Sequence, residues 1–219
     1  TFDVPLSELK AVSKANGATL NDAFMAGVTG GLRIYHERRD EPVERLRCNM
    51  PISLRNPERP AQNAVTIARF EVPVDIVDPG ERMRVIHDIV DGWRREPALH
   101  LVDPLAEVGS RVMPQELITS AAQKSDFTAS NVPGVPIPVW VAGAQVLAMY
   151  PMAGTIGAAT NVTLLSYNGS AGIGVSMDDA AIPDRALFAE CLGLGFAEVV
   201  GHPVSPSDPL QRVGGPATR

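Results

Sequence analysis

Cysteine, aromatic residues and clustered positive charge are all scarce in this chain of 219 residues. Its two cysteines, Cys48 and Cys191, lie far apart and outside any Cys-x-x-Cys or His-rich setting. No metal site is therefore expected, and a reducing, intracellular location is the default. The formal net charge is -6, and Lys and Arg form no cluster. This excludes a nucleic-acid partner, because binding to phosphates needs grouped positive charge.

Long hydrophobic runs are also missing. The longest apolar stretch, residues 139–154, is interrupted by Gly143, Gln145 and Pro151. A membrane-spanning helix needs about 20 apolar residues without such breaks. We therefore expect a soluble protein whose association with a membrane or a lipid droplet is at most peripheral.

The length and composition indicate one domain followed by a short tail. With 45% hydrophobic residues the chain can bury a substantial core, and no Gly/Ser-rich or charged linker divides its middle, which favours a single domain over residues 1–202. Residues 203–219 are rich in Pro and Gly with little to bury, so a disordered tail is predicted there. The chain begins at Thr1 without Met and enters a structured pattern at once, as a fragment or a processed product would.

Hydrophobic periodicity predicts helices alternating with strands early in the chain and a hairpin late. Thr19 is a good N-cap for a helix of about five turns, whose glycines predict close packing against another backbone or a ligand channel. The Asn168-Gly169 pair is the strongest hairpin signal. Other segments are expected to form helices over 6–15, 79–95, 101–112, 114–123 and from 184, and strands over 45–54, 63–74, 139–149, 161–167 and 173–177. This order predicts a layered α/β domain with a mixed sheet.

Two short polar blocks are the candidate functional residues. The first is Asn21 and Asp22, directly after the cap residue Thr19. Their structural interpretation is helix-start chemistry, in which Asn and Asp accept hydrogen bonds from the free amides of the first turn. Their functional interpretation is a pair of short polar groups that contact a substrate.

The second block runs from Thr128 to Gly134. Its structural interpretation is a strand that ends in a Pro-Gly turn, with Pro133 and Gly134 at the two corner positions. Its functional interpretation adds hydroxyl and amide donors from Thr128, Ser130 and Asn131, directed at an acyl carbonyl or an acceptor hydroxyl. The two interpretations are compatible.

Both blocks resemble motifs of the bacterial wax ester synthase/diacylglycerol acyltransferase family. Residues 21–22 look like its Asn-Asp motif, residues 51–55 like its Pro-x-Ser-x-Arg strand, and residues 128–134 like its Asn-Val-Pro-Gly-Pro signature. The chain departs from the family at Gln62, where Gly is usual, and at Val135, where Pro is usual. Further blocks follow in family order at 140–143, 150–151, 166–169 and 183–184. The resemblance extends over nearly the whole chain.

The resemblance implies the C-terminal half of a chloramphenicol acetyltransferase-like fold, in which two similar α/β halves enclose an active-site tunnel. It implies an O-acyltransferase that makes triacylglycerol or wax esters from diacylglycerol or a long-chain alcohol, with acyl-CoA as co-substrate and no bound cofactor. The general base of the family lies in a His-His-x-x-x-Asp-Gly motif of the N-terminal half. This chain lacks that motif, and an N-terminal half that carries it is its expected partner. The substrate-binding residues implied here are Asn21, Asp22, Thr128, Ser130, Asn131, Pro133 and Gly134.

One segment imitates part of that catalytic motif. Residues 87–92 fit His-x-x-x-Asp-Gly, which would make His87 a general base. However, His87 lies in a helical pattern, and Ile86 replaces the first His. We therefore predict a solvated helix face and no catalytic residue in this chain. The competing hypothesis is a non-catalytic lipid-binding or assembly module that pairs with a separate N-terminal half.

Overall fold

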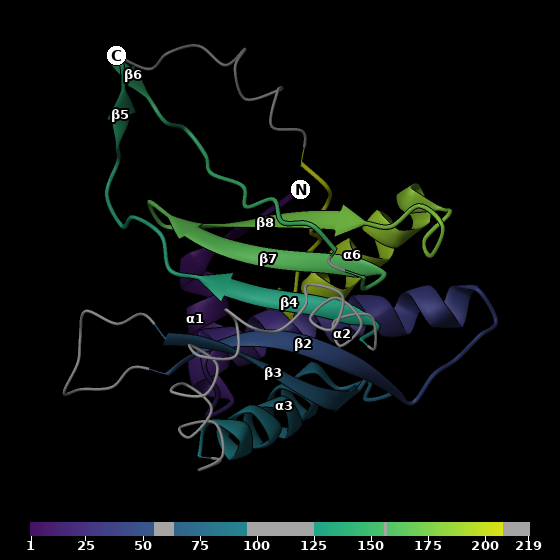
Figure 1. The fold of residues 1–219 in the computed structure, drawn as a ribbon. Helices are drawn as coiled ribbons and strands as arrows, with labels where there is room; N and C mark the ends of the chain where they lie inside the picture. Colours follow the sequence, from purple (N-terminus) through teal and green to yellow (C-terminus); the bar gives the residue numbers. More distant parts are fainter. Residues whose placement is uncertain (55–63, 96–124, 156, 208–219) are drawn as a thin grey trace, which may run out of the picture.

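The computed structural model describes residues 1–54, 64–95, 125–155 and 157–207 (Figure 1). A six-stranded sheet has the strand order β1-β8-β7-β4-β2-β3, and a separate two-stranded sheet pairs β5 with β6. In chain order the elements are β1 (Phe2–Pro5), α1 (Leu6–Ala15), α2 (Leu20–Arg38), β2 (Arg45–Leu54), β3 (Ala64–Pro73), α3 (Pro79–Arg94), β4 (Phe127–Val132), β5 (Trp140–Val141), β6 (Ala144–Gln145), β7 (Thr160–Tyr167), β8 (Ser170–Met177) and α6 (Arg185–Val200).

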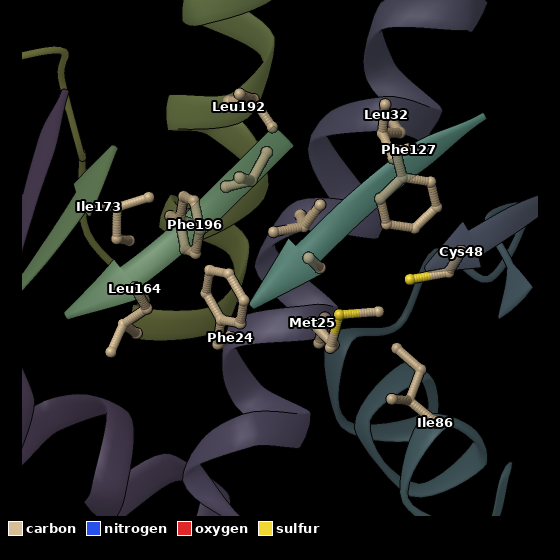
Figure 2. Close-up of a cluster of buried hydrophobic side chains, with 14 of the residues drawn as sticks. Phe24, Met25, Leu32, Cys48, Ile86, Phe127, Leu164, Ile173, Leu192 and Phe196 are labelled. Carbon is tan, nitrogen blue, oxygen red and sulfur yellow. The ribbon is translucent and has the colours of Figure 1, made fainter. Parts of the chain in front are cut away.

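The large sheet is mixed, as the sequence predicted. Strand β4 runs parallel to both of its neighbours, β2 and β7, whereas the other three pairings are antiparallel. Helices α2 and α6 cover one face of this sheet. Figure 2 shows the core between the sheet and these helices, in which Leu164 and Ile173 of the sheet lie near Phe24 of α2 and Phe196 of α6. Side chains alternate between the two faces of a strand. Hence Phe127 and Ala129, both buried, face the helices, and Thr128 faces away from them.

Glycines in α2 and α6 allow these two helices to touch backbone to backbone. A Cβ added at Gly195 would lie 2.2 Å from the amide nitrogen of Gly31 and 2.4 Å from the carbonyl oxygen of Gly27. Likewise, a Cβ at Gly31 would lie 2.7 Å from the Cα of Leu192. Of the two explanations for a glycine-rich helix, these contacts confirm close packing against another backbone.

Local sequence signals correctly located several elements. Thr19 caps α2, and its side chain accepts the amide of Asp22. Asn168 and Gly169 have φ angles of 45° and 84°, as a two-residue hairpin turn between right-twisted strands requires. Asp184 caps α6 by accepting the amide of Leu187 at 2.9 Å. Each signal acts within a few residues, which explains why sequence sufficed.

One strand prediction was wrong, and one strand was missed. Residues 139–149 do not form one strand, because Ala142 and Gly143 have positive φ angles of 50° and 83° and reverse the chain between β5 and β6. The result is a narrow hairpin that projects from the domain (Figure 1). Strand β1 was missed because it has only four residues and pairs with β8, about 170 positions away along the chain.

Other predictions fall on residues that the structure does not describe. The expected helices over 101–112 and 114–123 lie outside the described residues, as do residues 208–219 of the expected tail. In the described part of that tail, the amide of Ser207 donates to the carbonyl of Thr1 at 2.8 Å, and the Thr1 hydroxyl donates to the carbonyl of Ser207 at 2.7 Å. The domain boundary after residue 202 therefore stays a prediction.

Candidate functional site

The first turn of α2 is fixed by a capping box. The backbone amide and the hydroxyl of Thr19 each donate to Oδ2 of Asp22 at 2.8 Å, and the amide of Asp22 donates back to the Thr19 hydroxyl at 3.4 Å. Asp22 is 1% exposed. For Asp22, this confirms the helix-start interpretation, in which its carboxylate satisfies donors that have no partner inside the helix.

The capping box consists of Thr19 and Asp22, whereas Asn21 faces the sheet. Its Nδ2 lies 3.7 Å from Sδ of Met50, a residue of β2 that is 3% exposed and belongs to the core. Sulfur is a weak acceptor, so this contact uses little of the hydrogen-bonding capacity of the amide. Asn21 is therefore a half-buried polar group at the junction of α2 and β2.

Asn131 lies at the same end of the domain as Asn21. It faces the helices because it shares the alternation of Phe127 and Ala129, and it pairs in register with Leu164. In Figure 2, Leu164 lies beside Phe24 in the early part of α2, whereas Phe127, at the start of β4, lies beside Leu32 farther along that helix. Thus α2 and β4 run in opposite directions, and the end of β4 approaches the start of α2.

The pairing of β2 with β4 supports this placement. Asn49 of β2 pairs with Thr128 of β4, and Met50 is the next residue of β2 after this pair. Because Asn21 contacts Met50, the structure brings Asn21, Asp22 and Asn131 to one end of the helix-covered face.

Thr128 and Ser130 face the other way. On the opposite side of the sheet, Thr128 pairs in register with Asn49 and Asn161, and Ser130 pairs with Thr163. These neighbours are buried and form hydrogen bonds. Thr163 donates to Oδ1 of Asn161 at 2.9 Å, Asn161 donates to the carbonyl of Gly154 at 2.9 Å, and Ser125 donates to Oδ1 of Asn49 at 2.7 Å. The predicted block therefore divides into two groups on opposite faces.

Sequence analysis did not find Asn49, Asn161 or Thr163. A usable signal was the alternation of polar and apolar residues in residues 161–164, which matches that of residues 127–130 in β4. Only the parallel register, however, shows that the two alternating patterns share a face.

The expected turn at Pro133 and Gly134 is wrong. The chain continues alongside β7, where the amide of Gly134 donates to the Ser166 hydroxyl at 3.1 Å. A Cβ at Gly134 would lie 1.9 Å from the carbonyl oxygen of Ser166. Glycine is thus required for close approach of two backbones, not for a corner.

The prediction that His87 lies on a solvated helix face is also wrong. Its Nδ1 lies 2.8 Å from Oδ2 of Asp22, and its side chain is 34% exposed. That carboxylate oxygen already accepts two hydrogen bonds from Thr19, so His87 Nδ1 adds a third contact that joins α3 to the start of α2. Sequence could not reveal this pair because 65 positions separate its members.

The start of β4 is fixed by an ion pair. Arg47 of β2 donates to Asp126 through its guanidinium, at 2.8 and 3.2 Å, and through its backbone amide, at 2.7 Å. Partial burial of Asp126 raises the pKa of its carboxyl, but the hydrogen bonds and the charge of Arg47 outweigh burial and hold that pKa below its ordinary value. The pair aligns β4 with β2, which sets the position of Asn131.

Within the described parts of the chain, no three His, Cys, Asp or Glu residues are grouped so that they could hold a metal ion. The acidic residues near the start of α6 have structural partners, since Asp178 accepts the amides of Ala180 and Ala181, and Asp179 pairs with Arg185. Among the described helices, none is both long enough and apolar enough to cross a membrane.

Comparison with known proteins shows the family of this chain. The family model described as the WS/DGAT C-terminal domain matches residues 61–199. This chain belongs to the wax ester synthase/diacylglycerol acyltransferase (WS/DGAT) family. Two Mycobacterium tuberculosis proteins named "putative diacylglycerol O-acyltransferase" are 36% identical to it over 222 aligned residues. The alignment covers 100% of this chain and 43% of each relative. The WS/DGAT domain described here thus spans less than half the length of these relatives.

Solved structures show the same fold. The wax ester synthase/diacylglycerol acyltransferase from Marinobacter aquaeolei VT8 matches with a TM-score of 0.62 and 25% identity, over 91% of this chain and 48% of that protein. The first condensation domain of the CDA synthetase matches with a TM-score of 0.52 at 15% identity, over 92% of this chain and 43% of that protein. The WS/DGAT domain therefore has the chloramphenicol acetyltransferase-like fold, in the form of its C-terminal half.

Proposed function

We propose that this domain is half of an acyl-CoA-dependent O-acyltransferase that makes triacylglycerol or wax esters from diacylglycerol or a long-chain alcohol. The observation that carries the proposal is the 36% identity, over the whole chain, to proteins named as diacylglycerol O-acyltransferases. In the proposed reaction, a His of the N-terminal half takes the proton of the acceptor hydroxyl. The oxygen then attacks the thioester carbonyl, the ester forms, and CoA leaves as its thiol.

We assign two different roles to the predicted site residues. Asn21 and Asn131 present amide groups at one end of the helix-covered face, where they can fix an acyl carbonyl or an acceptor hydroxyl in the tunnel. Asp22 holds the first turn of α2 in place beneath them. Thr128 and Ser130 belong to the polar group on the opposite face of the sheet, and Pro133 and Gly134 direct the chain from β4 along β7.

The projecting hairpin is the proposed contact with the N-terminal half. Trp140 and Val141 are 60% and 66% exposed, and most of the other exposed large hydrophobic residues of the described chain also lie in or beside this hairpin. Clustered exposed apolar side chains usually mark an interaction surface. The hydroxyl of Tyr167 secures the base of the hairpin by accepting the amide of Val139 at 3.0 Å and donating to the carbonyl of Val146 at 2.8 Å.

A membrane or a lipid droplet is the other surface that exposed apolar side chains could contact. We propose a cytoplasmic protein in which such contact is peripheral and brings the complete enzyme to its lipid substrates. Floating the complete enzyme with vesicles, with and without Trp140→Ser, would measure this association. Loss of flotation in the variant would assign the hairpin to lipid, and unchanged flotation would leave it to the N-terminal half.

The activity is tested by measuring CoA release from palmitoyl-CoA, with a diacylglycerol or hexadecanol as acceptor and mass spectrometry of the lipid product. The complete enzyme should form the ester, and this domain alone should release no CoA above the rate without protein. If the complete enzyme binds these lipids but forms no ester with any acceptor, the non-catalytic binding module is the correct function. Turnover by this domain alone that disappears in His87→Ala would show that the general base lies in this half.

A further inference from the structure

The pair formed by His87 and Asp22 connects α3 to the start of α2, where Asn21 is proposed to bind the substrate. We infer that His87 is a positioning residue, which holds the start of α2, and with it the Asn21 amide, against the sheet. This inference rests on the proposed function of Asn21. The inference gives α3 a role in catalysis, although none of the family motifs named above lies in this helix.

The contacts of Asp22 show why His87 matters. Three donors meet at its Oδ2, and two of them, the amide and the hydroxyl of Thr19, belong to the same helix start. They close the first turn but cannot fix where that turn lies. His87 Nδ1, at 2.8 Å, is the contact to this oxygen that comes from another element. The pair is therefore what fixes the carboxylate of Asp22 relative to α3.

Burial strengthens this connection. The side chain of Asp22 is 2% exposed, and a carboxylate removed from water depends on its hydrogen bonds. A carboxylate oxygen accepts hydrogen bonds, so Nδ1 of His87 is the donor in this contact, which fixes the orientation of the ring. Asn21 is the adjacent residue, and its Nδ2 lies 3.7 Å from Met50 Sδ. Movement of Asp22 would move Asn21 away from β2.

The same geometry also suits a different role, which an experiment must separate. A buried carboxylate that orients Nδ1 leaves Nε2 free to take a proton, as in a catalytic triad. Within the described residues, His87 Nε2 has no hydrogen-bond partner. A positioning role needs only the Nδ1 donor, whereas a proton-transfer role needs Nε2.

Two substitutions distinguish these nitrogens. In His87→Asn the side-chain amide nitrogen occupies the place of Nδ1 and can still donate to Asp22. In His87→Ala both nitrogens are lost. Asp88→Ala is the matched control, because Asp88 is the next residue of the same helix and is exposed.

The kinetic test uses the complete enzyme with palmitoyl-CoA and a diacylglycerol. Displacement of a substrate-positioning group by about 1 Å can cost about 100-fold in rate, so His87→Ala should lower kcat by about tenfold or more, with little change in the KM for palmitoyl-CoA. His87→Asn should restore most of kcat and keep the pH profile of the wild type. Asp88→Ala should match the wild type in all three quantities.

Two kinetic results would overturn the inference. If His87→Ala keeps the wild-type kcat, the pair has no part in catalysis. If His87→Asn is as slow as His87→Ala and has lost a limb of the pH profile, His87 transfers protons through Nε2. A wild-type enzyme that forms no ester would instead contradict the proposed function.

If the complete enzyme forms no ester, hydrogen exchange still tests the positioning role, because this measurement needs no activity. In this domain, His87→Ala should speed amide exchange in peptides that cover residues 19–25, and His87→Asn should restore protection. Peptides of α6 should exchange alike in all variants. Unchanged exchange at residues 19–25 in His87→Ala would show that His87 does not hold the start of α2.

Discussion

The contact between α2 and α6 allows a quantitative test of the fold. Gly195→Ala places a methyl group 2.2 Å from the amide nitrogen of Gly31 and 2.4 Å from the carbonyl of Gly27. Both neighbours are backbone atoms of a helix, so neither can rotate away, and the two helices must separate. Overpacking of a well-filled core costs about 1–3 kcal/mol, and this contact belongs at the upper end of that range because only backbone can yield.

A second effect has the opposite sign. Replacing Gly by Ala inside a helix stabilises it by about 1 kcal/mol, because glycine loses more backbone entropy on folding. The net effect of Gly195→Ala is thus a destabilisation of about 2 kcal/mol, from about 3 of overpacking less about 1 of propensity. Gly92→Ala is the matched control, since Gly92 lies in α3 and a Cβ there meets no atom within 4 Å. Gly92→Ala therefore keeps only the favourable effect of helix propensity.

Urea unfolding followed by circular dichroism measures both variants. The unfolding free energies of Gly92→Ala and Gly195→Ala should differ by about 3 kcal/mol, with the control more stable than the wild type by about 1 kcal/mol. If Gly195→Ala is as stable as Gly92→Ala, the helices do not touch through their glycines, and the packing described for α2 and α6 is wrong.

Three further predictions concern the ion pair, the thiols and the projecting hairpin. Because Arg47 lowers the pKa of Asp126 in the folded state, the pair contributes its full stability above about pH 4, the ordinary range of an aspartate, and loses it as the pH falls through the lower folded value. Arg47→Met should therefore flatten the fall in unfolding free energy below pH 4, and an unchanged slope would show that the pair does not form. Burial raises the pKa of the Cys48 and Cys191 thiols. Both should react with a thiol reagent only after unfolding, and rapid labelling of the native protein would contradict their burial. The isolated domain should self-associate in sedimentation experiments, and Trp140→Ser should reduce this, whereas a monomeric wild type that binds no hydrophobic dye would exclude the hairpin as an interface.

Sequence reasoning succeeded where the determining interactions are local. The cap at Thr19, the turn at Asn168 and Gly169, and the amphipathic stripe of α2 are set by neighbours within a few positions. Their physical causes, which are free amides at a helix start and positive φ angles in a tight turn, can be read directly from residue types.

Sequence reasoning failed where distant segments determine the outcome. Gly134 has the composition of a turn but is needed for contact with the carbonyl of Ser166, which only the pairing of β4 and β7 brings near. His87 has the spacing of a solvated helix face, yet it packs against Asp22 because α3 lies beside α2. Thr128, Ser130 and Asn131 lie close together in the sequence and suggest one group of donors, whereas strand alternation divides them between two faces.

The central claim is that Asn131 lines the acyl-transfer site, at the end of β4 nearest the start of α2. The most direct measurement is kcat of the complete enzyme carrying Asn131→Ala, with circular dichroism to show that the variant is folded. Loss of one hydrogen-bond donor to a developing oxyanion typically lowers the rate about 100-fold or more. The account predicts a fall of that order at an unchanged melting temperature. A folded Asn131→Ala enzyme with the wild-type kcat would contradict the assignment, and Asn131 and Asn21 would then be structural residues alone.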